Sequence, residues 1–269
     1  SNGAHFYIFE NGIKTTERKI LSPVCEMQGK VKHANQRDEW FVLHKFQSDN
    51  IYIFLLKNKN IMCPLITQSQ NYIGNKGSNA PGELIFSPSG AKLALSIYSL
   101  NEINADGVVE LYDFNNVTGQ VSHLVNTPKL WLPIHSIFSP DESKLFVSER
   151  GKNLIQYDLE FLNTDSLDNS ANIIWTANGT FSNMALQYGS RNNIYGAIPD
   201  SLFVSEIKFP NEMGVNVDLN ISKIDLKGNE LSYGLPNFNA SYFYTPSIDF
   251  AYTEDCWGHS YNFEGRDTL

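Results

Sequence analysis

Five polar residues are the candidates for chemistry in this sequence, because their side chains bind ligands and their positions recur beside a repeated turn. They are His33, Asn35, Glu83, His135 and Asn183. Imidazole, carboxylate and amide groups that converge on one channel could hold a small ligand or a metal ion. The alternative is that they are hydrogen-bonded polar groups around a water-filled channel. The sequence leaves both interpretations open.

No motif of a known catalytic class accompanies these residues. The sequence has no Gly-x-Ser-x-Gly elbow, no His-Glu-x-x-His, no phosphate loop and no dinucleotide-binding glycine motif. We therefore expect no catalytic set, no metal site and no cofactor. The pairs Asp141-Glu142 and Glu254-Asp255 serve glycoside hydrolysis only with a partner about 5 to 9 Å away, so we expect solvated turn residues. His44 shares strand parity with Trp40, and we expect it to be a structural hydrogen-bonding residue.

The elements that position these residues are given by an internal repeat. Phe86–Ala94 and Phe138–Phe146 both read as an apolar strand end, a Ser-Pro turn, a lysine and a second apolar strand. Tyr188–Tyr195 is a degenerate copy downstream, and Gln36–Leu43 is the corresponding turn and strand upstream. The spacing between copies is close to 50 residues.

A second recurring element places one aspartate or its counterpart among apolar residues. It occurs at Tyr52–Leu55, Leu111–Phe114, Gln156–Leu159 and Lys223–Leu226. A glycine-containing turn often follows, as at Gly119 and Gly228. We interpret this element as the third strand of each repeat, entering a hairpin.

A period of about 50 residues with about four short strands predicts an all-β fold, a β-propeller of the WD40-like kind with four-stranded antiparallel blades. The expected blades are 28–67, 80–125, 133–177 and 182–232, with strands in 5–21 before them. Two arrangements stay open. A fifth blade forms from the two ends, or the chain is the C-terminal part of a larger, seven-bladed propeller.

Composition and charge exclude several partners. The 269 residues carry a net charge of -9 and no basic stripe, so nucleic acid is not expected. No apolar run reaches about 18 residues, so we expect no membrane insertion. Cys25, Cys63 and Cys256 form no CxxC pair, and we expect small buried thiols, with one bridge as the alternative. No signal peptide is visible, and we expect that a leader has been removed.

Several blocks in order carry a family resemblance. They are Val31–Asn35, Trp40–Leu56, Phe86–Lys92, Leu111–Phe114, Thr118–Ser122, Gly234–Phe238 and Ser241–Phe243. Together, over 20–263, they resemble the β-propeller region of secreted, gliding-motility-associated multidomain surface proteins of Bacteroidetes. Those proteins use type IX secretion and contain PKD modules. The chain departs from them in lacking over a hundred residues before the propeller and a sorting domain.

The resemblance implies a domain division and a location. Residues 1–246 would be the propeller, and 247–269 would be the start of a PKD or immunoglobulin-like module or a closing tail. The segments that carry the PKD resemblance are Phe250–Tyr252, Cys256–Gly258 and Phe263. A secreted or cell-surface location follows from the same resemblance.

The function expected from the sequence is an extracellular or cell-surface adhesion module without catalytic activity. It would bind a protein or a polysaccharide through its rim loops. The alternative is a carbohydrate-active propeller enzyme, a glycosidase or a lyase, with its site at the channel mouth. A third class is a scaffold that only spaces other modules. A carboxylate clustered with a histidine or tyrosine at one end of the channel favours the enzyme, whereas apolar and amide groups favour binding.

Overall fold

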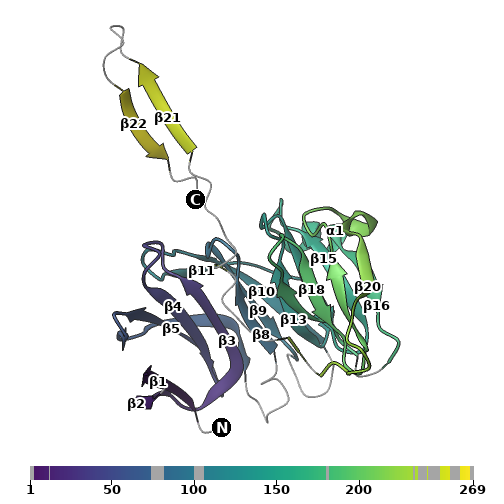
Figure 1. Cartoon of the computed structure of the whole chain (residues 1–269), viewed down its shortest axis with the longest axis horizontal. Coiled ribbons are helices and arrows are strands. Elements are labelled where there is room, and N and C mark those ends of the chain that lie inside the picture. The colour runs from purple at the N-terminus through teal and green to yellow at the C-terminus, as the bar shows by residue number, and fades with distance from the viewer. Residues whose placement is uncertain are drawn as a thin grey trace.

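The chain is described by a computed structural model that covers residues 3–11, 13–73, 82–99, 106–179, 182–232, 234–235, 241, 249–254 and 261–266. The fold is all-β, with four antiparallel sheets of the propeller type set side by side around a hollow (Figure 1). Each sheet is one blade, and in each blade four strands pair with one another in chain order, starting from the inner strand. The predicted fold class is confirmed.

The first two blades carry an additional short or edge strand. Blade 1 consists of β3 (Val24–Lys32), β4 (Glu39–Lys45), β5 (Ser48–Lys57), β6 (Asn60–Ile61) and β7 (Leu65–Ile73). Blade 2 consists of β8 (Gly82–Phe86), β9 (Lys92–Ile97), β10 (Asp106–Phe114), β11 (Val121–Asn126) and β12 (Leu130–Trp131). Both β6 and β7 pair with β5, and both β11 and β12 pair with β10.

The other two blades have four strands each. Blade 3 consists of β13 (Pro133–Phe138), β14 (Lys144–Glu149), β15 (Asn153–Asp158) and β16 (Asn172–Thr176), with the short helix α1 (Thr164–Ser170) before β16. Blade 4 consists of β17 (Ala185–Tyr188), β18 (Ile194–Ala197), β19 (Phe203–Ile207) and β20 (Leu219–Asp225), with the 3-10 turn η1 (Gly214–Val217) before β20. Two hairpins lie outside the blades: β1 (Ala4–Glu10) with β2 (Ile13–Leu21), and β21 (Asp249–Glu254) with β22 (Tyr261–Arg266).

The inner strands β3, β8, β13 and β17 are the ones that bring the blades together around the hollow. Their close approach explains Gly29 in the middle of β3. A β-carbon on Gly29 would lie 2.5 Å from Cδ2 of Leu84 on β8, which is too close for any side chain. The glycine therefore lets β3 and β8 lie against each other.

The repeated Ser-Pro turn holds the first and second strands of blades 2 and 3 in the same way. In blade 2 the Ser87 hydroxyl accepts a hydrogen bond from the Lys92 amide at 3.0 Å. In blade 3 the Ser139 hydroxyl accepts one from the Lys144 amide at 2.9 Å. Gly90 has a φ of +76° in the first copy, and Glu142 takes the matching position with a φ of +62°. The sequence repeat is thus a repeat of turn geometry.

Three apolar cores fill the spaces between neighbouring blades. The first contains Trp40, Phe86 and Phe114, whose rings meet edge to face at 5.8 Å (Trp40 to Phe114) and 4.8 Å (Phe86 to Phe114). Phe138 lies in the second core and Phe146 in the third. Aromatic residues of the repeated strands therefore fill the space between the blades.

The predicted blade bounds agree with the observed sheets at 24–73, 82–126, 133–176 and 185–225, and β1 contains the strand expected at the N-terminus. One strand assignment was wrong. Lys223–Asp225 lies on β20, the outermost strand of blade 4, and the third strand is β19. An aspartate flanked by apolar residues suits any half-buried strand before a turn, so the pattern does not identify the strand's rank.

The cysteine expectation holds in part. Cys25 is buried as expected, but Cys63 is exposed, and both are free thiols, so no bridge joins them. Cys256–Gly258, Pro236–Ala240 and Tyr242–Phe243 lie outside the described residues. The division at 246/247, the PKD module and the number of blades in a closed ring stay predictions. Among the described residues, no helix is long and apolar enough to cross a membrane.

Candidate functional site

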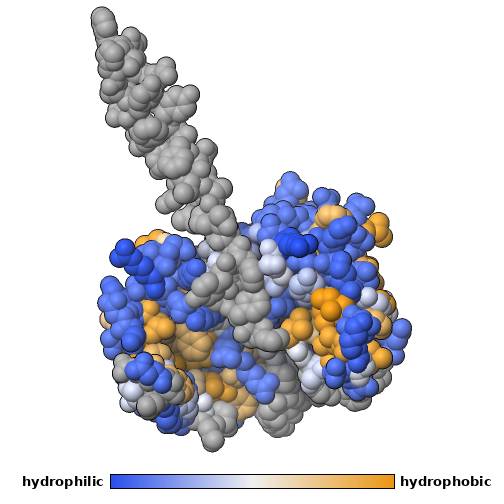
Figure 2. All heavy atoms as spheres, in the orientation of Figure 1, coloured by the Kyte–Doolittle hydropathy of each residue, from blue (hydrophilic) through white to orange (hydrophobic). Residues whose placement is uncertain are grey.

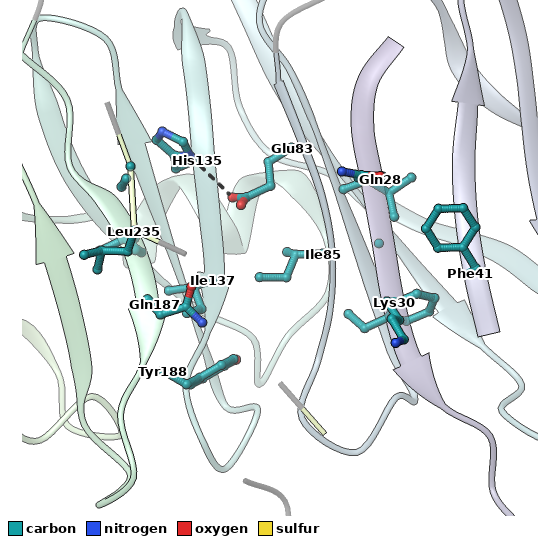
Figure 3. A pocket seen from close by; sticks show the side chains of 16 residues that line it. Gln28, Lys30, Phe41, Glu83, Ile85, His135, Ile137, Gln187, Tyr188 and Leu235 are labelled. Carbon is teal, nitrogen blue, oxygen red and sulfur yellow. Dashed lines mark ion pairs between the residues drawn. The ribbon is translucent and has the colours of Figure 1, made fainter. Parts of the chain in front are cut away.

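The candidate site is a pocket of about 410 Å³ in the hollow between the blades. All four inner strands contribute to its wall, together with Gly234 and Leu235 after blade 4 (Figure 3). Hydrophobic residues show in patches on both sides of the hollow, within a mostly hydrophilic surface (Figure 2). The pocket therefore lies where the inner strands of four separate blades meet.

A glutamate and a histidine from neighbouring blades form the chemical centre of this pocket. Glu83 follows the first residue of β8, and His135 is the third residue of β13. Oε2 of Glu83 lies 3.7 Å from Nδ1 of His135, and the two side chains are 25% and 21% exposed. Figure 3 shows them pointing toward each other across the wall of the pocket. A substrate in the pocket can therefore reach both groups.

Backbone and hydroxyl contacts fix this pair at the junction of blades 2 and 3. The Ser136 amide donates to Oε2 of Glu83 at 2.8 Å, so the carboxylate is held by the strand that carries His135. The buried hydroxyl of Ser96, on β9, donates to the hydroxyl of Ser136 at 3.0 Å. These bonds set the position of β13 against blade 2. The carboxylate is therefore positioned before any ligand enters.

The pair has the parts of a general base. A carboxylate beside one imidazole nitrogen orients the ring and stabilises the imidazolium that forms when the other nitrogen takes a proton. The separation of 3.7 Å is longer than a hydrogen bond. Such contacts are often long in unliganded sites and shorten in the substrate complex.

Three further pocket residues have polar side chains that face the hollow. They are Gln28 and Lys30 on β3, both exposed, and Gln187 on β17, which is half-buried. Amide groups of this kind orient hydroxyl-bearing ligands by hydrogen bonds. Lys30 also pairs with Glu39 on β4 at 2.9 Å. The sequence analysis missed all three, although alternating polar residues on an inner strand were the signal that could have found them.

Tyr188 lines the pocket but is not available as an acid. Its hydroxyl donates to the carbonyl oxygen of Phe138 at 2.8 Å. Burial, with the nearby charges of Glu142 and Glu83, raises the pKa of the Tyr188 hydroxyl well above its usual value. The side chain therefore remains neutral and serves to join blades 3 and 4.

Two of the five predicted site residues do not belong to the pocket. His33 lies just beyond the end of β3, where its ring stacks on Trp40 and its Nε2 lies 3.1 Å from the carbonyl oxygen of Val117. The side chain of Asn35 accepts hydrogen bonds from the Arg37 and Asp38 amides in the same turn. Both hold the turn between β3 and β4. They lie outside this pocket because the inner strand ends at Lys32, before the channel-facing alternation reaches them.

Asn183 is also not part of the pocket wall. It is 3% exposed and lies two residues before β17 begins. The structure therefore brings together Glu83 and His135 and separates the other three candidates from them. Among the described residues, no group of three metal-ligating side chains comes together, so none of the five is placed in a metal site.

The carboxylate pair Asp141-Glu142 has a structural role in the blade 3 turn. Asp141 accepts hydrogen bonds from the hydroxyls of Ser139 and Ser143. Glu142 accepts one from the Ser89 amide at 2.6 Å and so connects the turns of blades 2 and 3. The expectation of turn residues is confirmed, although hydrogen bonds within the protein replace solvent. Asp255 lies outside the described residues.

Comparison with known proteins bears on the fold. No protein-family model matches the chain, and no curated protein does. The periplasmic gluconolactonase of Pseudomonas aeruginosa is similar at 12% identity and a TM-score of 0.44, over 81% of this chain and 72% of that one. A provisionally assigned 6-phosphogluconolactonase of Bacteroides uniformis is similar at 13% identity and a TM-score of 0.46, over 82% of this chain and 65% of that one.

A third similar structure is the WD40 repeat domain of RRP9. It shares 14% identity and a TM-score of 0.45, over 72% of this chain and 51% of that one. The chain thus spans about half to three quarters of the length of these structures. At such identities the likeness concerns the propeller-type fold alone.

The expectation of a non-catalytic adhesion module that binds through rim loops is corrected. Two of the similar structures carry the names of a gluconolactonase and a provisionally assigned 6-phosphogluconolactonase, and neither is named as an adhesin. The pocket itself has the carboxylate and histidine clustered at one place in the hollow, which is the feature that favours the enzyme alternative. The interpretation as an adhesion module is therefore abandoned.

Proposed function

We propose that this protein is a carbohydrate-active hydrolase that cleaves an ester or lactone bond of a sugar derivative in the central hollow. The observation that carries the proposal is the contact between Glu83 and His135 in a pocket open to solvent. A positioned imidazole with a carboxylate behind it is the usual general base for water attack on a carbonyl carbon.

The proposed reaction needs only water as the second reactant. His135 takes a proton from water, and the oxygen of that water forms a bond to the ester carbonyl carbon. The carbon–oxygen bond to the leaving alcohol then breaks, and the imidazolium returns the proton to the leaving oxygen. Glu83 holds the ring through Nδ1 during both transfers. The amide of Gln187 faces the same space and supplies a donor for the substrate oxygens.

The pocket favours ester chemistry over the glycosidase considered from the sequence. A glycosidase needs two carboxyl groups about 5 to 9.5 Å apart. Among the described residues that line the pocket, Glu83 is the single carboxylate. The hydroxyl of Tyr188, the other acidic side chain there, is bonded to Phe138. One base with an orienting carboxylate suits hydrolysis of a carbonyl ester.

The location and wider family membership belong to the same proposal. An extracytoplasmic protein that acts on polysaccharide or a sugar ester outside the cell fits the sequence resemblance to secreted Bacteroidetes surface proteins. The names of the similar gluconolactonases supply the first substrates to try, and the proposal does not rest on them.

The test is a pH-stat assay of acid release from a panel of substrates. The panel contains D-glucono-1,5-lactone, D-galactono-1,4-lactone and an acetylated xylan, each corrected for its spontaneous hydrolysis. His135→Ala is the inactive variant, and Lys227→Gln is the control, because Lys227 is an 83% exposed lysine in the turn after β20. Turnover that His135→Ala abolishes and Lys227→Gln retains supports the proposal. Equal turnover by His135→Ala and wild type refutes it.

A further inference from the structure

A second group of side chains lies in the same pocket on blade 1, apart from Glu83 and His135. It consists of Gln28, Lys30 and Phe41, here called the blade 1 cluster. Lys30 and Phe41 are directly opposite each other on β3 and β4, so both project from the same face of the sheet. Gln28 is two residues from Lys30 and shares that face. Figure 3 shows the three side chains together across Ile85 from the reactive pair.

Residues along β3 alternate between buried and exposed, and this alternation leaves the face that carries Gln28 and Lys30 open to solvent. Met27, Gly29 and Val31 are buried against blade 2, whereas Gln28 and Lys30 are exposed on the opposite face. Phe41, a half-buried aromatic residue, lies opposite Lys30 in the register of β3 and β4. The core shared with blade 2 takes Met27 and Val31 from the other face of β3, so it does not include this amide and this cation. Leu43 and Phe54 are buried on the same face as Phe41 and pack the outer part of that face.

We infer that the blade 1 cluster is a binding subsite for an acidic sugar ring of an oligosaccharide. The face of Phe41 covers the apolar face of a pyranose ring, and the Gln28 amide bonds to its hydroxyls. The Lys30 ammonium pairs with the carboxylate of a uronic acid. This inference rests on the proposed function, since it names the substrate class of the same pocket.

The blade 1 cluster and the reactive pair lie on different blades, so a ligand that contacts both has to be a chain of sugars. The reactive pair comes from β8 and β13, and the cluster comes from β3 and β4, with Ile85 between them in Figure 3. The pocket continues past the reactive pair to Gln187 and Leu235 beside blade 4. A single ring cannot contact both ends of a pocket that crosses four inner strands. An oligosaccharide that bears its ester near His135 places a neighbouring acidic ring on blade 1.

Lys30 already has a carboxylate partner, which a ligand carboxylate has to share or replace. Glu39 lies 2.9 Å from the Lys30 ammonium, and the two side chains are 18% and 45% exposed. The lysine side chain is therefore open enough to solvent for a ligand to reach it. A ligand carboxylate would share or replace that contact at little cost, because an exposed ion pair is weak.

The test measures binding rather than turnover, so that it stands apart from the test of catalysis. Isothermal titration calorimetry compares trigalacturonic acid with its fully methyl-esterified form, which has the same rings without the charges. Lys30→Gln tests the charge, and Phe41→Leu tests the ring. Glu39→Gln tests whether the ion pair alone matters, and Lys227→Gln is the surface-charge control. His135→Ala is included because it removes the proposed base and leaves the cluster intact.

Three results support the subsite. Lys30→Gln weakens binding of the acid about fivefold and leaves the methyl ester unchanged, as expected for one part-exposed ion pair. Phe41→Leu weakens both ligands to a similar extent. Glu39→Gln tightens binding of the acid, because it frees the ammonium group.

Other results overturn it. The inference fails if acid and methyl ester bind equally, if neither binds, or if Lys30→Gln is matched by Lys227→Gln. It also fails if Glu39→Gln weakens binding as much as Lys30→Gln does. Binding that His135→Ala retains, with no turnover of any ester by wild type, would refute the proposed function and leave the subsite standing. Turnover by the wild type without selective binding of the acid would support the proposed function and refute the subsite.

Discussion

Two histidine sites of this protein, one inside blade 1 and one in the hollow, show opposite uses of the same side chain. His44 on β4 is fully buried, with Nδ1 2.9 Å from the carbonyl oxygen of Lys45 and Nε2 3.0 Å from the hydroxyl of Ser69. His135 on β13 is partly exposed and faces Glu83 in the pocket. The first imidazole has neutral partners on both nitrogens, and the second has a carboxylate on one side.

At these two histidines, burial decides whether the side chain has a structural role or can take part in proton transfer. Burial lowers the pKa of His44 to about 4, so that its ring is neutral at ordinary pH. A ring held neutral with both nitrogens occupied cannot exchange protons with a substrate. His135 has an accessible ring and an anionic partner, so it can take a proton and keep it during a reaction. The predicted structural role of His44 is confirmed.

Replacing each of the two histidines should change catalytic activity by very different amounts. His135→Ala should lower kcat for the ester substrate by about 10² to 10⁴-fold, because a general base is lost. His44→Ala should leave kcat within about threefold of wild type in the fraction that is folded. Steady-state assays on protein of known folded fraction, measured by circular dichroism, check both. A similar loss in the two variants would mean that His135 acts through stability alone.

The second effect is a pH dependence of stability that belongs to His44. Its folded-state pKa of about 4 lies below the ordinary 6.5. The contribution of neutral His44 is therefore fully present above pH 6.5 and is lost as the pH falls from 6.5 towards 4. The free energy of unfolding should fall by up to about 3 kcal/mol over that range from this group. Urea titrations at several pH values, on wild type and His44→Gln, measure it.

The control compares wild type with His44→Gln in how steeply the free energy of unfolding changes with pH. His44→Gln should be less stable than wild type near neutral pH and should show a flatter decline below pH 6.5. Glu110 contributes with the opposite sign, because burial raises the pKa of its carboxyl group above the ordinary value. Its contribution therefore grows as the pH falls. An unchanged slope in His44→Gln would show that other groups account for the dependence.

The sequence predicted the blades well because their signals are local. A Ser-Pro turn is stabilised by residues within the turn, as the hydroxyl of Ser87 on the Lys92 amide shows. Spacing between such turns therefore gives blade length directly. The wrong rank of Lys223–Asp225 has the same origin, since local pattern does not say which neighbour a strand pairs with.

The site could be predicted only in part because it is assembled from separate blades. Glu83 and His135 could be proposed from the sequence because each lies on an inner strand beside a repeated turn. His33 lies beyond the end of β3, and its imidazole contacts Val117, a residue of another blade that local pattern does not identify. Lys30 and Phe41 meet through strand register, which a single sequence does not contain.

A smaller effect tests whether Glu83 acts on His135 by its charge. Glu83→Gln keeps an oxygen to accept the Ser136 amide, so the junction of blades 2 and 3 should keep its stability within about 0.5 kcal/mol. Loss of the negative charge should lower kcat about tenfold and leave KM nearly unchanged, because the imidazolium is less stabilised. Equal kcat in Glu83→Gln and wild type would remove the carboxylate from the mechanism.

The smallest effect tests the neutral partner of the buried histidine. Ser69 is 6% exposed, and its hydroxyl also lies 2.8 Å from the carbonyl oxygen of Asn71. Ser69→Ala leaves Nε2 of His44 without its hydroxyl partner in a dry site, so unfolding free energy should fall by about 1 kcal/mol. Ser122→Ala, at an exposed hydroxyl on β11, is the matched control and should change stability by less than about 0.5 kcal/mol. Urea denaturation near pH 7.5 compares them. If Ser69→Ala is as stable as Ser122→Ala, the buried histidine is satisfied by the carbonyl of Lys45 alone, and the contrast with His135 then depends on burial without the hydroxyl.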